Sequence, residues 1–132
     1  MITEQQVKIM KSAYGTLYEL ENTMRTYIQI QMEKNYGIHW YHLAPRQVLK
    51  RPPLKKRLEQ FQFHEYEPYF RNYSSVFKNL PQKFFTHLHL LYPLRNKIAH
   101  NQVLSQSELQ VFEKSTSIVL AYMSVNHYEK TS

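Results

Sequence analysis

The chain has 132 residues, a formal net charge of +7 and no cysteine. This length favours one domain over residues 1–132 with a single core, and the composition excludes disulfides and thiolate zinc sites. The first residues lack the basic-then-apolar order of a secretion signal and no apolar run approaches ~20 residues, so we expect a cytoplasmic protein outside the membrane.

Hydrophobic periodicity predicts a long first helix over residues 3–34. Thr3 and Gln6 have the spacing of a capping box, and apolar residues then recur at three-, four- and seven-residue steps. The expected inward positions are Val7, Met10, Tyr14, Leu17, Leu20, Met24 and Ile28. Gly15 inside this helix predicts a closely packed neighbouring helix, because glycine there costs about 1 kcal/mol relative to alanine. Gly37 is placed to end the helix.

Residues 35–53 predict a packed connector that is irregular and rich in proline and aromatic residues. Trp40, Pro45 and the Pro52-Pro53 pair prevent a continuous helix there. Pro53 can begin a helix, which we expect to reach about residue 64. The apolar stripe of that helix would be Leu54, Leu58 and Phe61.

Two further helices are expected after Pro68 and from Pro81. The inward positions of the first would be Tyr69, Tyr73, Val76 and Phe77, and those of the second Phe84, Phe85, Leu88 and Leu91. Pro93 is expected to interrupt the second helix, because its nitrogen cannot donate a hydrogen bond and its ring crowds the preceding turn. A new helical start there would place free N–H groups beside Arg95.

The last helix is expected over residues 105–127. Ser105 with Glu108 forms a capping box, and Leu104 with Leu109 forms a hydrophobic staple. The stripe comprises Leu109, Phe112, Thr116, Val119, Leu120 and Met123. The pattern as a whole predicts an all-α single-domain bundle of about four to five helices, framed by the first, fourth and last. Aromatic residues on the stripes, such as Tyr14, Phe84, Phe85 and Phe112, are expected in the core.

Six cations lie within twelve residues, three in the connector and three on the polar face of the helix expected after it, and we call them the basic segment: Arg46, Lys50, Arg51, Lys55, Lys56 and Arg57. One interpretation is a solvated basic face. The other is a surface that follows the phosphates of RNA, with Trp40 and Tyr41 available to stack on an unpaired base.

The segment from Arg95 to His100 carries groups that can cleave RNA without a metal ion. A guanidinium matches the phosphoryl oxygens that gain charge in the transition state, and an imidazole can move protons near neutral pH. Five helical residues rotate by about 140°, so on a straight helix the two side chains point to different sides. Three arrangements would let both side chains act on one phosphate. The helix loosens before His100, the arginine side chain wraps around the helix, or two chains share the site.

The spacing alone has other interpretations. Arg57 and His64 form a second arginine-to-histidine pair, and Arg95 is otherwise a solvated cation near a helix end. We expect no metal site, because the histidine pairs His39/His42 and His87/His89 lack a nearby cysteine or carboxylate at ligand spacing.

The motif resembles the signature of the HEPN superfamily and is most similar to its abortive-infection-like members. The resemblance rests on Arg95-Asn96-Lys97-Ile98-Ala99-His100-Asn101 with Leu90-Leu91-Tyr92-Pro93-Leu94 before it and Leu104-Ser105 after it, and more loosely on Leu20-Glu21-Asn22-Thr23-Met24-Arg25, Tyr36-Gly37 and Trp40-Tyr41. It implies a metal-independent endoribonuclease without cofactors, in which the RNA 2′-hydroxyl attacks its own phosphodiester. His100 would move protons, Arg95 would stabilise the charged transition state, and Asn96 would orient the phosphate or His100.

The resemblance also implies a homodimer with a composite active site and a role as a toxin or in phage defence. The partners would be RNA, contacted by the basic segment and Lys97, and an antitoxin or another regulatory protein. The alternative is a non-catalytic helical module that binds RNA, a nucleotide or a partner protein.

Overall fold

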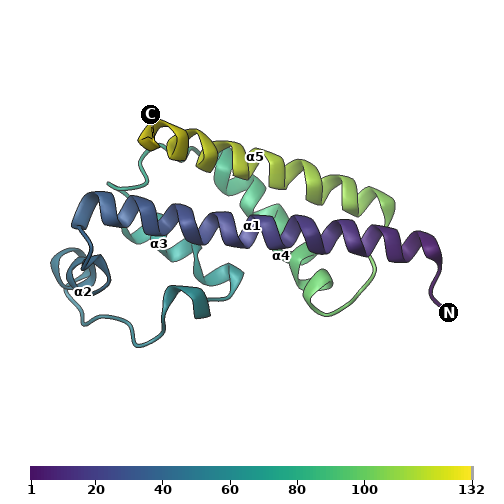
Figure 1. Cartoon of the computed structure of the whole chain (residues 1–132), viewed down its shortest axis with the longest axis horizontal. Helices are drawn as coiled ribbons and strands as arrows, with labels where there is room; N and C mark the ends of the chain where they lie inside the picture. The colour runs from purple at the N-terminus through teal and green to yellow at the C-terminus, as the bar shows by residue number, and fades with distance from the viewer. Residues whose placement is uncertain (132) are drawn as a thin grey trace. The chain divides into compact units, whose positions relative to one another are not determined.

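The structure, a computed structural model, describes the backbone of residues 1–131 and the side chains of residues 1–123. All regular elements in this part of the chain are helical (Figure 1). They are α1 (Glu4–Tyr36), α2 (Trp40–Ala44), α3 (Glu67–Asn72), α4 (Gln82–Ala99) and α5 (Gln106–Thr131), with three short helical turns, η1 (Pro45–Leu49), η2 (Leu58–Gln60) and η3 (Phe63–Glu65). The prediction of an all-α fold is confirmed.

Helix α1 begins and ends where the sequence predicts. The N–H of Gln6 donates to Thr3 Oγ1 at 3.1 Å, and the N–H of Thr3 donates to Gln6 Oε1 at 2.9 Å. Gly37 follows the helix with φ +86°, a left-handed conformation that glycine adopts without steric cost.

The buried face of α1 differs from the predicted stripe in its first half. Its buried residues are Ile9, Ala13, Leu17, Leu20, Met24, Tyr27, Ile28, Gln31 and Met32, whereas Val7 and Tyr14 are exposed. The expected close neighbour of Gly15 is also wrong, because nothing lies within 4 Å of the position that a β-carbon would take there.

The chain divides into two compact units, and helix α1 contributes its first part to one unit and its last part to the other. The first comprises Met1–Thr23 and Leu80–Ser132, and the second comprises Met24–Asn79. That the whole chain forms one domain remains a prediction.

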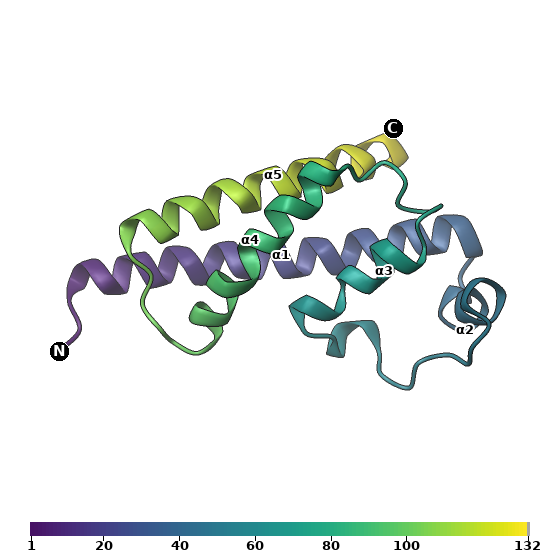
Figure 2. The same cartoon turned by 180° about the vertical axis from the view of Figure 1, so that it is seen from behind.

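The first unit contains the beginning of α1 together with α4 and α5, the latter two lying side by side (Figure 2). Gln5 contacts Gln106 at 3.4 Å and Ser12 contacts Glu113 at 2.8 Å. Both pairs are separated by 101 residues, so α1 and α5 run parallel in one register. The core includes Leu17, Leu20, Phe84, Phe85, Leu88, Leu91, Ile98, Leu104, Phe112, Val119 and Met123. Predicted stripes of α4 and α5 therefore face this core.

The second unit has an aromatic core between the end of α1 and α3. The ring centroids of Tyr27 and Phe77 are 5.8 Å apart, and those of Phe70 and Phe77 are 5.1 Å apart with edge-to-face geometry. Such pairs stabilise beyond their buried area by about 0.5–1.5 kcal/mol. Tyr69, Tyr73 and Phe77 are buried as predicted.

The helix expected from Pro53 to about residue 64 is wrong. Residues 53–57 have no regular structure, and the turns η2 and η3 follow. The side chains of Gln60 and Glu65 accept hydrogen bonds from the N–H groups of Arg57 and Gln62, both at 2.8 Å. Such local bonds favour tight turns over a helix.

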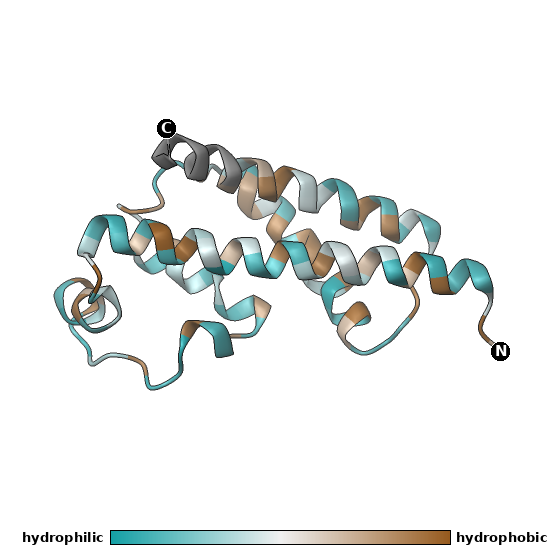
Figure 3. Cartoon of the chain, in the orientation of Figure 1, coloured by the Kyte–Doolittle hydropathy of each residue, from teal (hydrophilic) through white to brown (hydrophobic). Residues whose placement is uncertain are grey.

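Polar and apolar residues alternate along α1, as Figure 3 shows by their hydropathy. Among the described residues, no helix combines the length and the apolar character that crossing a membrane requires.

Candidate active site at the end of helix α4

Helix α4 continues through Pro93 to Ala99, so the predicted interruption and new helical start are wrong. An internal proline costs about 3 kcal/mol, but its neighbours Leu91 and Leu94 are both buried. Burying each leucine gains about 1.5–3 kcal/mol, which offsets the proline. Arg95 therefore lies in the last turns of α4, and the positive end of a helix dipole is not available beside it.

Backbone hydrogen bonds fix the end of α4 at the motif. The N–H of Asn101 donates to the Ile98 carbonyl at 3.1 Å, and the N–H of Gln102 donates to the Lys97 carbonyl at 2.8 Å. Asn101 has φ 59°, a left-handed conformation that asparagine tolerates better than most residues. These features define a Schellman motif, and they give Asn101 a structural role at this helix end.

Tyr14 reaches this helix end from α1. Its hydroxyl donates to the Ile98 carbonyl at 2.9 Å and also contacts Asn101 Oδ1. The Tyr14 side chain is therefore exposed rather than in the core as predicted. Tyr14 lies at this helix end because the last carbonyls of a helix lack intrahelical donors and the tyrosine hydroxyl supplies one.

Arg95 is held by an acidic residue from α1. Its Nε donates to Glu21 Oε1 at 3.1 Å, and the two side chains are 21% and 25% exposed. Within the described part of the chain, the terminal nitrogens of Arg95 have no recorded partner. Sequence reasoning missed Glu21, although a carboxylate directly after the buried Leu20 was a usable signal.

His100 is exposed and forms the C-cap of α4. Its N–H still donates to the Asn96 carbonyl at 3.1 Å, so the Cα of His100 keeps the place of a last helical residue. The rotation of about 140° from Arg95 therefore largely persists within one chain. Asn96 is exposed one turn before His100. The backbone thus brings Asn96 and His100 to one side and leaves Arg95 on another.

Lys97 pairs with the first turn of α5. Its Nζ lies 2.7 Å from Glu108 Oε2, while the N–H of Ser105 donates to Glu108 Oε1 at 2.9 Å. The Lys97 hydrogen bond is the main cause of a lowered pKa at Glu108, and the Ser105 N–H adds to it. A contact of Lys97 with RNA would compete with this ion pair.

The six cations of the basic segment are all exposed and lie in the second unit. Lys56 Nζ pairs with Glu65 at 2.7 Å, and Arg57 lies 3.9 Å from Glu59. The other four have no ion pair among the described residues: Arg46, Lys50, Arg51 and Lys55. Lys50 has φ 56°, and its N–H donates to the Pro45 carbonyl.

The remaining histidines have ordinary partners where the structure records them. His87 Nδ1 lies 3.0 Å from Ser115 Oγ, and the His89 ring stacks on Tyr92. Among the described residues, no group of three or more potential ligands converges on a metal position. Comparisons with protein-family models, curated proteins and solved structures found no match for this chain.

Proposed function

We propose that this chain is a metal-independent endoribonuclease of the HEPN type, in which Arg95 and His100 are the catalytic pair. One observation supports this proposal most. Glu21 binds Arg95 through Nε alone, which orients the guanidinium and leaves its terminal N–H groups for a ligand. A positioned guanidinium and an exposed histidine are the two groups that a reacting phosphate requires, one for its developing charge and one for proton transfer.

The proposed reaction exchanges one phosphorus–oxygen bond for another and moves one proton from the 2′-oxygen to the 5′-oxygen. The 2′-hydroxyl loses its proton to a His100 imidazole, its oxygen bonds to the adjacent phosphorus, and the bond from phosphorus to the 5′-oxygen breaks. A second His100, or the same ring after proton transfer, protonates the leaving oxygen. The products are a 2′,3′-cyclic phosphate and a 5′-hydroxyl. Arg95 stabilises the phosphorane-like state, and Asn96 positions the phosphate or His100.

A two-fold dimer would bring the divergent groups together, since a self-complementary interface repeats each residue on both sides. An exposed aromatic face lies beside the motif and supports this arrangement. Tyr14 and Tyr18 are 42% and 74% exposed. They share one face of α1 with Glu21 because these positions are three and four residues apart. Exposed aromatic rings on this face favour its burial against a second copy of the chain.

A non-catalytic binding module is the second candidate, and it is favoured by the four cations of the basic segment that have no ion pair with the side chains the structure describes. Such a module would bind RNA, a nucleotide or a partner protein without cleavage. The cellular context that we propose for the enzyme, a toxin or phage-defence effector restrained by an antitoxin or another regulatory protein, follows the HEPN resemblance.

Incubation of the purified protein with total RNA, with and without EDTA, tests the proposal. We expect cleavage in both conditions, and at least a roughly 10²–10³-fold loss of rate for Arg95→Ala and for His100→Ala with unchanged circular dichroism. Arg71→Ala is a matched control, because Arg71 also pairs with a glutamate at 3.1 Å but lies outside the motif. His89→Ala controls for loss of an exposed histidine on the same helix. Near-normal cleavage by either motif variant, or inhibition by EDTA, would contradict the assignment.

A further inference from the structure

The second unit contains a cavity of about 360 Å³ that the proposed chemistry does not use. Its walls are mainly apolar and include the rings of Trp40, Tyr41, Phe61, Tyr69 and Tyr73. The connector, η3 and α3 supply the rest of the lining, in which Arg51 is the one basic residue of permanent charge. At the small end of the roughly 300–1,000 Å³ typical of ligand sites, this volume suits one ring system rather than several.

The aromatic walls hold one another in place. The centroids of Trp40 and Tyr69 are 6.2 Å apart, those of Phe61 and Tyr69 are 5.7 Å apart, and Tyr69 stacks on Tyr73 at 5.8 Å. Trp40, Tyr69 and Tyr73 are almost fully buried. Rings fixed in this way present faces and edges to a ligand at little entropic cost, because they are already ordered.

One hydroxyl group in the wall lacks a well-formed hydrogen bond. Tyr41 Oη is buried and makes no hydrogen bond of acceptable geometry within the described chain, although the Tyr69 hydroxyl is near enough to affect its ionisation. Burial raises the pKa of Tyr41 and that of Tyr69, so both hydroxyls keep their protons at neutral pH. The Tyr41 O–H can therefore still donate to a ligand acceptor, because a buried hydroxyl without a well-formed hydrogen bond is unfavourable.

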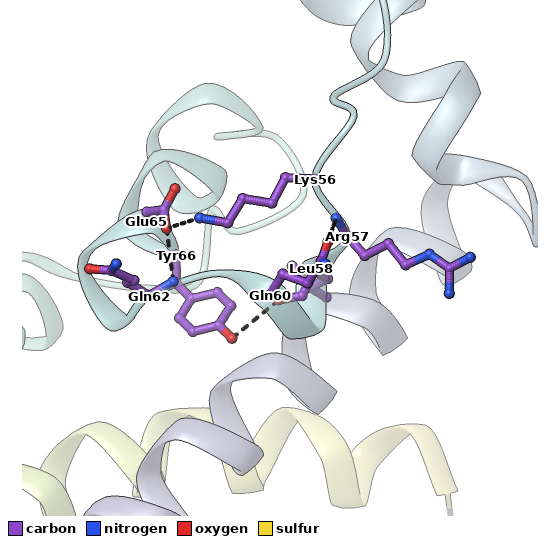
Figure 4. A network of polar contacts seen from close by, with 7 residues as sticks. All are labelled: Lys56, Arg57, Leu58, Gln60, Gln62, Glu65 and Tyr66. Carbon is purple, nitrogen blue, oxygen red and sulfur yellow. Dashed lines mark hydrogen bonds and ion pairs between the residues drawn. The ribbon is translucent and has the colours of Figure 1, made fainter.

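The charges around the cavity favour an anionic ligand. Glu65 also lines it, but its carboxylate accepts hydrogen bonds from Lys56 Nζ at 2.7 Å and from the Gln62 N–H at 2.8 Å (Figure 4). Lys56 is the main cause of a lowered pKa at Glu65. The negative charge of Glu65 is therefore already paired with Lys56 and would not attract a cation. Arg51, in contrast, has no ion pair within the described residues.

We propose that this cavity binds a nucleobase stacked on its aromatic walls, with the attached phosphate at Arg51. A flat heterocycle fits the ring-lined space, its polar edge can accept from Tyr41, and its phosphate matches a guanidinium at the rim. The source is an unpaired base of RNA or a free nucleotide. The preference for RNA rests on the proposed function, whereas the base-and-phosphate chemistry rests on the cavity alone.

Trp40 gives a direct test, because it is the only tryptophan of the chain and lines the cavity. The full-length His100→Ala variant, chosen to prevent cleavage, is titrated with a single-stranded oligouridylate and separately with UMP. We expect RNA to quench Trp40 fluorescence. Quenching by UMP at comparable concentrations would instead assign the site to free nucleotides, and quenching by neither probe would overturn the proposal.

Two substitutions in this background separate stacking from charge. By anisotropy of labelled RNA, Tyr41→Leu should weaken binding roughly 5- to 150-fold, the range for loss of one base–aromatic stack. Arg51→Gln should weaken binding and reduce the log–log salt slope by about 0.7, the value for one lost phosphate contact on a single strand. Arg71→Gln, an exposed arginine of the same unit, should leave affinity unchanged.

The two proposals fail in different ways. If the wild-type chain cleaves RNA but Tyr41→Leu and Arg51→Gln bind RNA normally while retaining their circular dichroism, the cavity assignment is wrong and the endoribonuclease stands. If cleavage is absent but both substitutions weaken binding as expected, the cavity assignment stands and the enzyme is wrong.

Discussion

Gly15 lowers the stability of helix α1 and makes no packing contact that would offset the loss. It lies on the exposed side of α1, and the space around its missing side chain is open. Glycine loses more backbone freedom on folding than alanine does. The position therefore lowers helix stability without a packing benefit.

Gly15→Ala should raise the free energy of unfolding by about 0.5–1 kcal/mol, as measured by urea denaturation. Gly37→Ala is the matched control with the opposite sign. Its φ of +86° strains an L-residue, so the free energy of unfolding should fall. A destabilised Gly15→Ala protein would mean that something packs against this site in solution.

At the scale of elements, Glu108 joins two helices. It caps the start of α5 through Ser105 and pairs with Lys97 near the end of α4. Both contacts favour the carboxylate form, so the pKa of Glu108 is lower in the folded chain than the ordinary value of 4.5. Its contribution to stability is therefore present above that pH and is lost as the pH falls through the folded pKa.

Glu108→Gln should make stability depend less on pH as the pH falls from neutral through the acid range, because the amide keeps a cap acceptor without titrating. Urea denaturation at several pH values measures this. Lys97→Met should produce the same flattening, since it removes the main cause of the shift. An unchanged pH dependence in both variants would show that other carboxylates dominate acid unfolding.

Elements that depend on local signals could be predicted from the sequence. Thr3 with Gln6 and Ser105 with Glu108 mark helix starts within four residues, and Gly37 marks an end by its own conformation. The helix through Pro93 could not be predicted, because burial of neighbouring leucines outweighs a local penalty. Glu21 and Tyr14 were missed as partners of the motif for a related reason, since both reach it from a different helix.

At the scale of the whole molecule, the divergence of Arg95 from His100 bears on the oligomeric state. If each site takes residues from two chains, a mixture of Arg95→Ala and His100→Ala proteins should recover activity. Random pairing gives about half heterodimers, each with one intact pair of motif residues. A cleavage assay after mixing should then exceed either variant alone.

Native mass spectrometry verifies that the mixed dimers form. Tyr18→Glu is a useful companion, because a charge on the exposed face of α1 should separate the copies and lower cleavage. Mixed dimers as inactive as their parents leave two arrangements, a site within one chain or one that needs all four groups. A tandem fusion with both substitutions in one half is active only if one chain suffices.

The parallel alignment of α1 with α5 also sets an order of events during synthesis. Gln5 and Ser12 meet partners 101 residues later in the chain. At about 5–20 residues per second, a ribosome needs roughly 5–20 seconds to deliver those partners after Gln5 and Ser12 themselves have been made. Until α5 has been made, Leu17 and Leu20 lack the complete cover that α4 and α5 together provide. The nascent chain therefore exposes an amphipathic helix to chaperones, or to other nascent chains, well before its own core can form.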